Sequence, residues 1–155
     1  MSEPALEDFE KGIDDATIIN VEKPLETPLL TVSVLTPANG AVAIFKVPGM
    51  NEEFVQNFCL STGAFSFPRA TRLRFAFKST CSQVEFGLFH LPPTPTPDPA
   101  MAAAFDSDGK QLAAVLIEGD FESGKITLTA PEGKRIAYLE LVRPFGFLDN
   151  FLLFP

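Results

Sequence analysis

The sequence predicts an all-β protein, an antiparallel two-sheet β-sandwich of the jelly-roll type with at most one short helix. Short segments in which apolar and polar residues alternate recur along the 155-residue chain, as in half-buried strands. The 10 Gly and 14 Pro residues lie between these segments and divide the chain into short pieces. Hydrophobic residues, including 16 Phe, make up 46 % of the chain and provide for a real core. We expect one domain spanning residues 1–155.

The alternating segments predict roughly eight to ten strands. In residues 71–78 (TRLRFAFK), Leu73, Phe75 and Phe77 alternate with basic residues, which we place on the solvent side of the strand. Residues 50–60 (MNEEFVQNFCL) are the best candidate for the short helix. The other predicted strands lie near residues 16–22, 29–36, 41–47, 83–91, 126–128, 137–141 and 147–153.

Two connections have clear turn chemistry. Residues 91–100 (LPPTPTPDPA) hold five prolines, so we expect a stiff crossover between the sheets; a peptide ligand for another protein is the alternative. Asp106, Asp108 and Gly109 predict the turn of a hairpin. They also resemble the start of a calcium loop, but Ile117 stands where an EF-hand has its last glutamate.

Composition argues against several function classes. The net charge of −8 and the lack of a Lys/Arg run argue against nucleic acid and against anionic membranes as partners. No apolar stretch reaches the roughly 20 residues of a membrane helix. The acidic N-terminus lacks the features of a classical signal peptide, which leaves a cytoplasmic protein, export by a non-classical route, or a trimmed leader.

The residues with catalytic chemistry form no known pattern. Cys59 and Cys81 are the only cysteines, and with the single His90 they are too few for a zinc site; they form either one disulfide or two buried free thiols. A Cys–His nucleophile would need Cys59 or Cys81 beside His90, and the spacing does not support this. We therefore expect a protein that is not an enzyme.

Several short motifs occur in a recognisable order: Asp8-Phe9-Glu10, LRFAF (73–77), AAFDSDGKQL (103–112), the segment 136–141, and the ending FGFLDNFLLF (145–154). In this order the chain resembles the galactose-binding-like jelly-roll superfamily, the architecture of many carbohydrate-binding modules. Bacterial domains of this type often close with an Asp-Asn or Asp-Asp pair on the last strand. The resemblance covers residues 8–10 and about 71–154, and it implies a fold more firmly than a function.

The resemblance also implies a structural calcium ion that joins the two ends of the chain, with Glu10 and Asp149 as its ligands. Asp149 shares the parity of Phe147, Phe151 and Leu153, so we expect its side chain to point into the sandwich. A buried carboxylate needs a partner, and calcium takes six to eight oxygens. Without a metal, Asp149 would accept hydrogen bonds from backbone amides or pair with Arg143.

Sugar sites combine aromatic platforms with polar groups. Without Trp, the candidates are Tyr138, on an outer face, and Phe65, Phe67 and Arg69 in a loop-like segment. We therefore expect a non-catalytic binding module whose partner is a carbohydrate. The alternative is a protein-interaction or structural module on the same scaffold.

Overall fold

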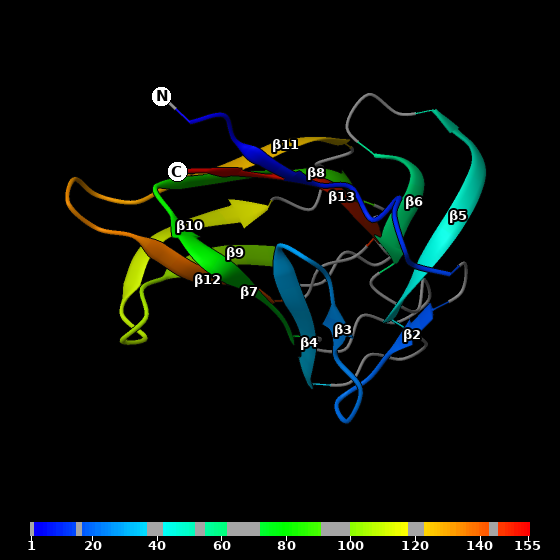
Figure 1. Ribbon diagram of the computed structural model, residues 1–155, viewed down its shortest axis with the longest axis horizontal. Helices are drawn as coiled ribbons and strands as arrows, with labels where there is room; N and C mark the ends of the chain where they lie inside the picture. The colour runs from blue at the N-terminus through cyan, green and yellow to red at the C-terminus, as the bar shows by residue number, and fades with distance from the viewer. Residues whose placement is uncertain are drawn as a thin grey trace.

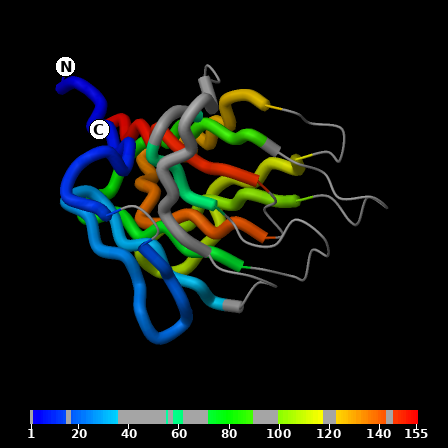
Figure 2. The backbone as a smooth tube through the Cα atoms, turned by 90° about the vertical axis from the view of Figure 1, so that its right-hand side faces the viewer, coloured from blue at the N-terminus to red at the C-terminus, as the bar shows by residue number. Residues whose placement is uncertain are grey.

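The computed structural model describes residues 2–14, 17–36, 42–51, 55–61, 72–90, 100–117, 123–142 and 146–155. The described residues contain strands and no helix, and the strands form two antiparallel sheets, which confirms the predicted fold class (Figure 1). The two ends of the chain lie close together at one end of the molecule (Figure 2).

The seven-stranded sheet has the order β11-β8-β13-β6-β5-β2, and β1 pairs with β13. Its members are β1 (Ala5–Glu7), β2 (Thr17–Ile19), β5 (Val42–Asn51), β6 (Gln56–Ser61), β8 (Gln83–His90), β11 (Ser123–Thr129) and β13 (Gly146–Phe154). The strand β13, last in sequence, is therefore central in space, between β8 on one edge and β6 and β1 on the other.

The six-stranded sheet has the order β10-β9-β12-β7-β4-β3. Its members are β3 (Leu25–Glu26), β4 (Leu30–Thr36), β7 (Arg72–Cys81), β9 (Ala100–Phe105), β10 (Gln111–Ile117) and β12 (Ile136–Val142). In this half of the fold the chain changes sheet between β8 and β9, between β10 and β11, and between β11 and β12. The proline-rich residues 91–99 lie outside the described residues, but the strands that they join lie in different sheets, as a crossover requires.

The core lies between the sheets, and Phe151 of β13 stands at its centre. Its ring stacks on Phe86 at 5.2 Å in its own sheet and on Phe75 at 4.8 Å in the other sheet, measured between ring centroids. Phe9 meets it edge-on at 6.0 Å. All four rings are fully buried. This cluster joins both sheets and the N-terminal segment, as expected of Phe, which brings large apolar area and no polar group.

The predicted hairpin around Asp106 is confirmed. The Oδ1 atom of Asp106 accepts hydrogen bonds from the amides of Asp108 and Lys110, and its carbonyl accepts one from Gly109. Gly109 has a φ of 82°, a left-handed conformation that glycine adopts without strain. These contacts form a turn, and β9 pairs with β10 directly on either side of it.

The helix predicted over residues 50–60 is wrong. Apart from Val55, its described residues belong to β5 and β6, which pair from Ala43↔Ser61 to Asn51↔Gln56. β6 also pairs with β13 through Phe147 and Leu148. Hydrogen bonding to two neighbouring strands outweighs the weak helical period of this window, because local propensity differences are small compared with tertiary pairing.

The predicted orientation of Asp149 is also wrong, because β13 contains a β-bulge. Asp149 pairs with Gly87 and Leu152 with Glu85, so two residues of β13 oppose the single Phe86 of β8. Gly87 and Glu85 alternate with the core residues Val84, Phe86 and Leu88. Asp149 therefore lies on the face of the sheet turned away from the core, with Phe147, whereas Phe151 and Leu153 face inward.

Candidate functional site

β1 and β6 both pair with the same edge of β13, and the pairing changes from one strand to the other next to the bulge. β1 pairs with Phe151, Leu152 and Leu153, whereas β6 pairs with Phe147 and Leu148. Asp149 and Asn150 occupy the step between them. We call the residues around this step, Glu10, Phe58, Cys59, Asp149 and Asn150, the β13 junction.

Asp149 is buried in this junction although it faces away from the core. Only 1 % of its surface is exposed. Its Oδ1 atom accepts a hydrogen bond of 2.8 Å from the backbone N–H of Asn150. Asn150 has a φ of 53°, a conformation that Asn tolerates better than most side chains. The Asp-Asn pair is therefore a local unit, in which Asn forms the bulge and Asp caps its amide. Arg143, the alternative ion-pair partner, lies outside the described residues.

Glu10 reaches the same junction from the N-terminal segment. Its Oε1 atom accepts a hydrogen bond of 3.1 Å from the amide of Phe58, at the start of β6. Burial, followed by the negative charges of Asp149 and Glu10, raises the pKa of the Cys59 thiol to about 12. Glu10 and Asp149, the two residues predicted as metal ligands, therefore both act on one buried thiol. The hydrogen bond between Glu10 and Phe58 joins residues that are 48 positions apart in the chain.

The junction offers a limited donor set for a metal. Within the part of the chain that the structure describes, no three His, Cys, Asp or Glu residues are grouped so that they could hold an ion. Two carboxylates alone do not fill the shell of calcium, so backbone carbonyls and water would have to supply the other oxygens. A protonated thiol such as Cys59 is not a calcium ligand. The chemistry fits a hard, oxygen-seeking cation and does not fit zinc.

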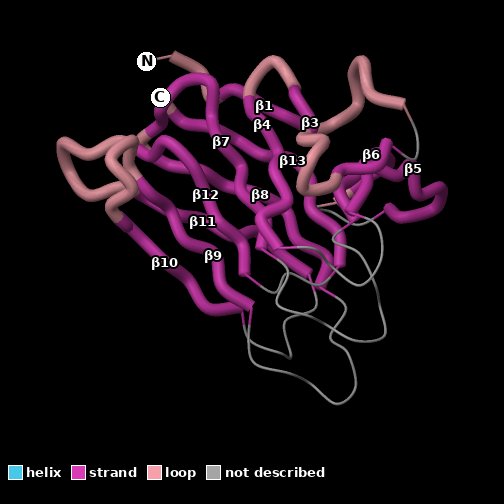
Figure 3. Tube along the Cα trace, turned by 90° about the horizontal axis from the view of Figure 1, so that it is seen from below, coloured by secondary structure: helices cyan, strands magenta, loops and turns pink. Residues whose placement is uncertain are grey.

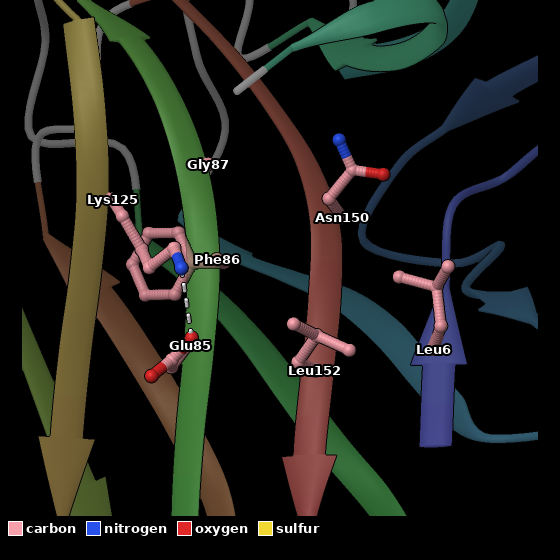
Figure 4. Close-up of a pocket in the computed structure, with 7 residues that line it drawn as sticks. All are labelled: Leu6, Glu85, Phe86, Gly87, Lys125, Asn150 and Leu152. Carbon is pink, nitrogen blue, oxygen red and sulfur yellow. Dashed lines mark ion pairs between the residues drawn. The ribbon is translucent and has the colours of Figure 1, made fainter. Parts of the chain in front are cut away.

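A groove lies on the outer face of the seven-stranded sheet, beside the junction. It has a volume of about 350 Å³. Figure 4 shows its floor on β8, where Gly87 has no side chain, and its walls on β11, β13 and β1. The groove is lined by Leu6, Glu85, Phe86, Gly87, Lys125, Asn150 and Leu152.

The groove has one polar wall and one apolar wall. On β8 and β11, Glu85 Oε2 and Lys125 Nζ form an ion pair at 3.2 Å, and Gln83 donates a hydrogen bond of 3.0 Å to the other oxygen of Glu85. On the opposite side, Leu152 and the half-exposed Leu6 present methyl groups. Asn150 stands on β13 at one end of the groove, and its amide is directed away from Glu85 and Lys125 (Figure 4). Because Lys125 and Glu85 neutralise each other, the polar wall carries no net charge.

The sequence reasoning missed this groove. Glu85 and Lys125 each look like ordinary solvent-facing residues of separate strands, and only the pairing of β8 with β11 brings them together. A signal was present in Gly87, which interrupts an otherwise bulky strand, since glycine within a strand often marks a place where another group approaches closely.

Tyr138 lies on the outer face of the six-stranded sheet, as predicted, but its ring is enclosed. On one side it stacks on Phe105 of β9, with ring centroids 5.0 Å apart and planes 9° from parallel. On the other side, from β7, the guanidinium of Arg74 lies 4.6 Å from the centre of the ring. Arg74 and Arg72 both bind Glu140, at 2.6 Å and 2.9 Å. A sugar ring would have to displace Arg74 or Phe105 to stack on Tyr138.

The structure leaves one set of predicted binding residues untested and describes the state of both cysteines. Phe65, Phe67 and Arg69 lie outside the described residues, so their binding role stays a prediction. Cys59 and Cys81 are both buried thiols that no disulfide joins, which decides between the two alternatives for the cysteines. Burial raises the pKa of Cys81 to about 11, the opposite of what activates a nucleophilic cysteine.

Neither a known protein family nor a curated protein matches the sequence. Among solved structures, the lectin binding domain of Lectinolysin complexed with Lewis b has a TM-score of 0.39 and 6 % identity, over 63 % of this chain and 70 % of that one. The carbohydrate binding module of Cellvibrio mixtus lichenase 5A in complex with cellotriose has a TM-score of 0.35 and 8 % identity, over 90 % and 96 %.

A third structure is the enzymatically active domain of tailspike protein 4 of Bacteriophage CBA120. It has a TM-score of 0.38 and 14 % identity over 80 % of this chain, but only 19 % of the tailspike chain is covered. Two of the three proteins are carbohydrate-binding domains and one is an enzyme. At TM-scores of 0.35 to 0.39, none of them identifies a family, a ligand or an activity for this chain.

No helix in the described residues has the length and apolar character needed to span a bilayer.

Proposed function

We propose that this protein is a non-catalytic binding module and that its ligand is a carbohydrate held in the groove on the outer face of the seven-stranded sheet. The observation that carries this proposal is that one groove is lined by a carboxylate, an ammonium group and an amide, from Glu85, Lys125 and Asn150, and by two leucines. The resemblance of the sequence to galactose-binding-like jelly rolls supports the same ligand class.

The groove matches the chemistry of a sugar ring. A pyranose carries hydroxyl groups that both donate and accept hydrogen bonds, and Glu85, Lys125 and Asn150 offer both partners. Its C–H faces are apolar and pack against leucine methyl groups as well as against aromatic rings. The volume of about 350 Å³ lies at the lower end of the range of ligand sites, which suits one or two sugar units. Because the ion pair is neutral, we expect neutral sugars to bind in preference to uronic acids.

A glycan array followed by isothermal titration calorimetry of the hits tests the proposal. Glu85→Gln and Lys125→Ala each remove one polar partner, and Asn150→Gly removes the amide while keeping a residue that tolerates the left-handed backbone. Each variant should weaken binding of a neutral glycan by about tenfold, as expected for one lost hydrogen bond to a charged or amide group.

The matched control is Lys110→Ala, which removes an exposed lysine from the hairpin turn far along the six-stranded sheet. It should bind glycans as the wild type does. If no glycan binds, or if glycans bind equally well to all groove variants, the groove is not a carbohydrate site. A protein-interaction module then becomes the better description.

We propose in addition that the β13 junction binds one calcium ion with a structural role. Three features support this: the nearly complete burial of Asp149, the influence of both Asp149 and Glu10 on the buried thiol of Cys59, and the position of Glu10 soon after β1, where the N-terminal segment leaves β13. When bound, the ion would neutralise two carboxylates and join the first and last parts of the fold. Without the ion, the carboxylates are stabilised by hydrogen bonds such as those from the amides of Asn150 and Phe58.

Thermal unfolding with and without chelator tests the calcium proposal. Chelator should lower the melting temperature and added calcium should restore it, since a ligand that binds only the folded state stabilises it. Glu10→Gln should abolish the response to calcium, and Glu132→Gln, in an exposed turn, should retain it. If neither chelator nor calcium changes the melting temperature of the wild-type protein, the calcium proposal is wrong. The groove proposal would be unaffected.

A further inference from the structure

One part of the groove wall belongs to the beginning of the chain. All lining residues except Leu6 lie on β8, β11 and β13. Leu6 is the middle residue of β1 and pairs with Leu152 of β13, so the two side chains lie on the same, outer face of the sheet. Figure 4 shows Leu6 on the far side of β13 from Glu85 and Lys125. The apolar wall of the groove is therefore complete only when β1 is docked, that is, paired with β13.

β1 is a short strand that is anchored at one end. Within the described part of the chain it pairs with residues 151–153 of β13 and with no other strand. Figure 3 shows the two ends of the chain side by side, as this pairing requires. Soon after β1 the chain is held by Phe9, which is fully buried, and by Glu10, which accepts a hydrogen bond from the amide of Phe58. A terminal strand of three residues opens locally at a lower free energy than the core, so β1 can leave β13 while Phe9 stays in place.

The docked and open states of β1 offer a sugar different contacts. Leu6 is 49 % exposed when β1 is docked, and a sugar ring in the groove would cover it together with Leu152. When β1 leaves β13, Leu6 leaves the groove, whereas the polar groups of Glu85 and Lys125 stay on β8 and β11. The docked state therefore binds the sugar more tightly than the open state. A ligand that prefers one of two states shifts the equilibrium toward that state.

We propose that the docking of β1 and the binding of a neutral sugar in the groove are coupled, so that the bound sugar holds β1 on β13 and the release of β1 weakens the binding. This inference rests on the proposed function of the groove and adds its regulation. The two effects have the same size, because the coupling free energy between two binding events is reciprocal. The docking of residues 5–7 thus sets the affinity of a site whose polar groups lie on other strands.

Hydrogen exchange of the 155-residue chain tests the coupling, without sugar and with the tightest neutral oligosaccharide of the glycan array at about 100 times its Kd. The amides of β1 that bond to β13 should exchange more slowly with the sugar, by up to about 100-fold if the sugar binds the docked state alone. The matched control is β2, which also has three residues at an edge of the same sheet and an exposed aliphatic residue, Ile18. Its amides should exchange at the same rate with and without sugar, because β2 contributes no residue to the groove.

A pair of variants tests the same coupling through affinity. Leu6→Ala should weaken binding of that oligosaccharide by about fivefold, because it removes apolar contact area, and the sugar should then protect β1 less. Ile18→Ala should bind as the wild type does. If the oligosaccharide binds but slows β1 no more than β2, or if Leu6→Ala binds as tightly as the wild type, the coupling is wrong, and the groove proposal still depends on the Glu85 and Lys125 variants. If no glycan binds, both proposals are wrong.

Discussion

Asn150 and Phe9 are the two non-glycine residues with positive φ in the described structure, at 53° and 56°. Asn150 belongs to the β13 junction, and Phe9 directly precedes its member Glu10. Such conformations cost free energy for residues with a Cβ and persist where the surroundings hold them. The carboxylate of Glu7 holds the amide of Phe9 at 2.9 Å, and that of Asp149 holds the amide of Asn150 at 2.8 Å. The same local device, a carboxylate that binds a nearby backbone amide, therefore supports both residues.

A series of substitutions at Asn150 tests this account at the scale of the residue. Asn150→Gly should leave stability within about 1 kcal/mol of the wild type, because glycine adopts this φ without strain. Asn150→Ala should cost about 1–2 kcal/mol, and Asn150→Val more, because a β-branched side chain is a strong outlier at positive φ. Urea unfolding measures the free energy of unfolding of each variant and so gives their order of stability. Equal stabilities of the Gly and Val variants would contradict the left-handed conformation.

Residue-level reasoning from the sequence went part of the way at this site. A carboxylate and an amide inside an apolar strand predicted that the two residues have a special role, and Asp149 is indeed buried. The predicted inward orientation failed because a bulge reverses the alternation of a strand, and whether a bulge forms depends on the register with β8. A strand considered alone carries no information about its register.

β1 and β13 illustrate the next scale, that of the element. β1 has only three residues, too few for its own pattern to predict a strand, and the sequence analysis did not identify it. Its position follows from β13, because β6 pairs with this edge only at Phe147 and Leu148 and β1 pairs with it further along, at residues 151–153. It also follows from Phe9, which enters the core two residues after β1. The N-terminal segment thus holds the fold closed through one short ladder and one buried ring.

The contact between Phe9 and Phe151 predicts a measurable coupling. Each single substitution by leucine should destabilise the fold by about 1–2 kcal/mol, since the volume is largely kept. The double variant should lose less than the sum, by about 0.5–1.5 kcal/mol, because the edge-to-face contact can be lost only once. Urea unfolding of the wild type, the two single variants and the double variant measures the coupling energy of this double-mutant cycle.

Phe105→Leu is the control for this cycle. Phe105 stacks on Tyr138 on the outer face of the other sheet, so its effect should add to that of Phe9→Leu. A coupling of zero between Phe9 and Phe151 would contradict the arrangement of the aromatic cluster.

Over the whole molecule, the two buried thiols make stability depend on pH in the alkaline range. The pKa is raised from its ordinary value of 9.0 to about 12 for Cys59 and about 11 for Cys81, in both cases chiefly by burial. Between these values the unfolded chain releases the thiol protons and the folded chain keeps them. Stability from this source is complete below about pH 9 and is lost as the pH rises through the folded values.

We therefore expect the free energy of unfolding to fall between about pH 9 and pH 11, and to fall less in Cys59→Ala and Cys81→Ala. Comparison with these variants isolates the contribution of the thiols, because every other titratable group is the same in all proteins of the set. Chemical unfolding at three pH values measures the slope. An identical slope in the wild type and in a variant that lacks both thiols would show that the thiols are not buried.

By itself, the sequence determined the class of fold and most of the strands, because period-two alternation and scattered Gly and Pro act locally and leave the chain few other ways to bury 16 Phe. It also located the hairpin at Asp106 and the special pair Asp149-Asn150. The tertiary structure alone decided that β5 and β6 occupy the described ends of the window 50–60, that Asp149 turns outward beside Cys59, and that Glu85 and Lys125 line a groove. Each of these depends on which strands become neighbours and in what register, and pairing between residues far apart in the chain is invisible in any local pattern.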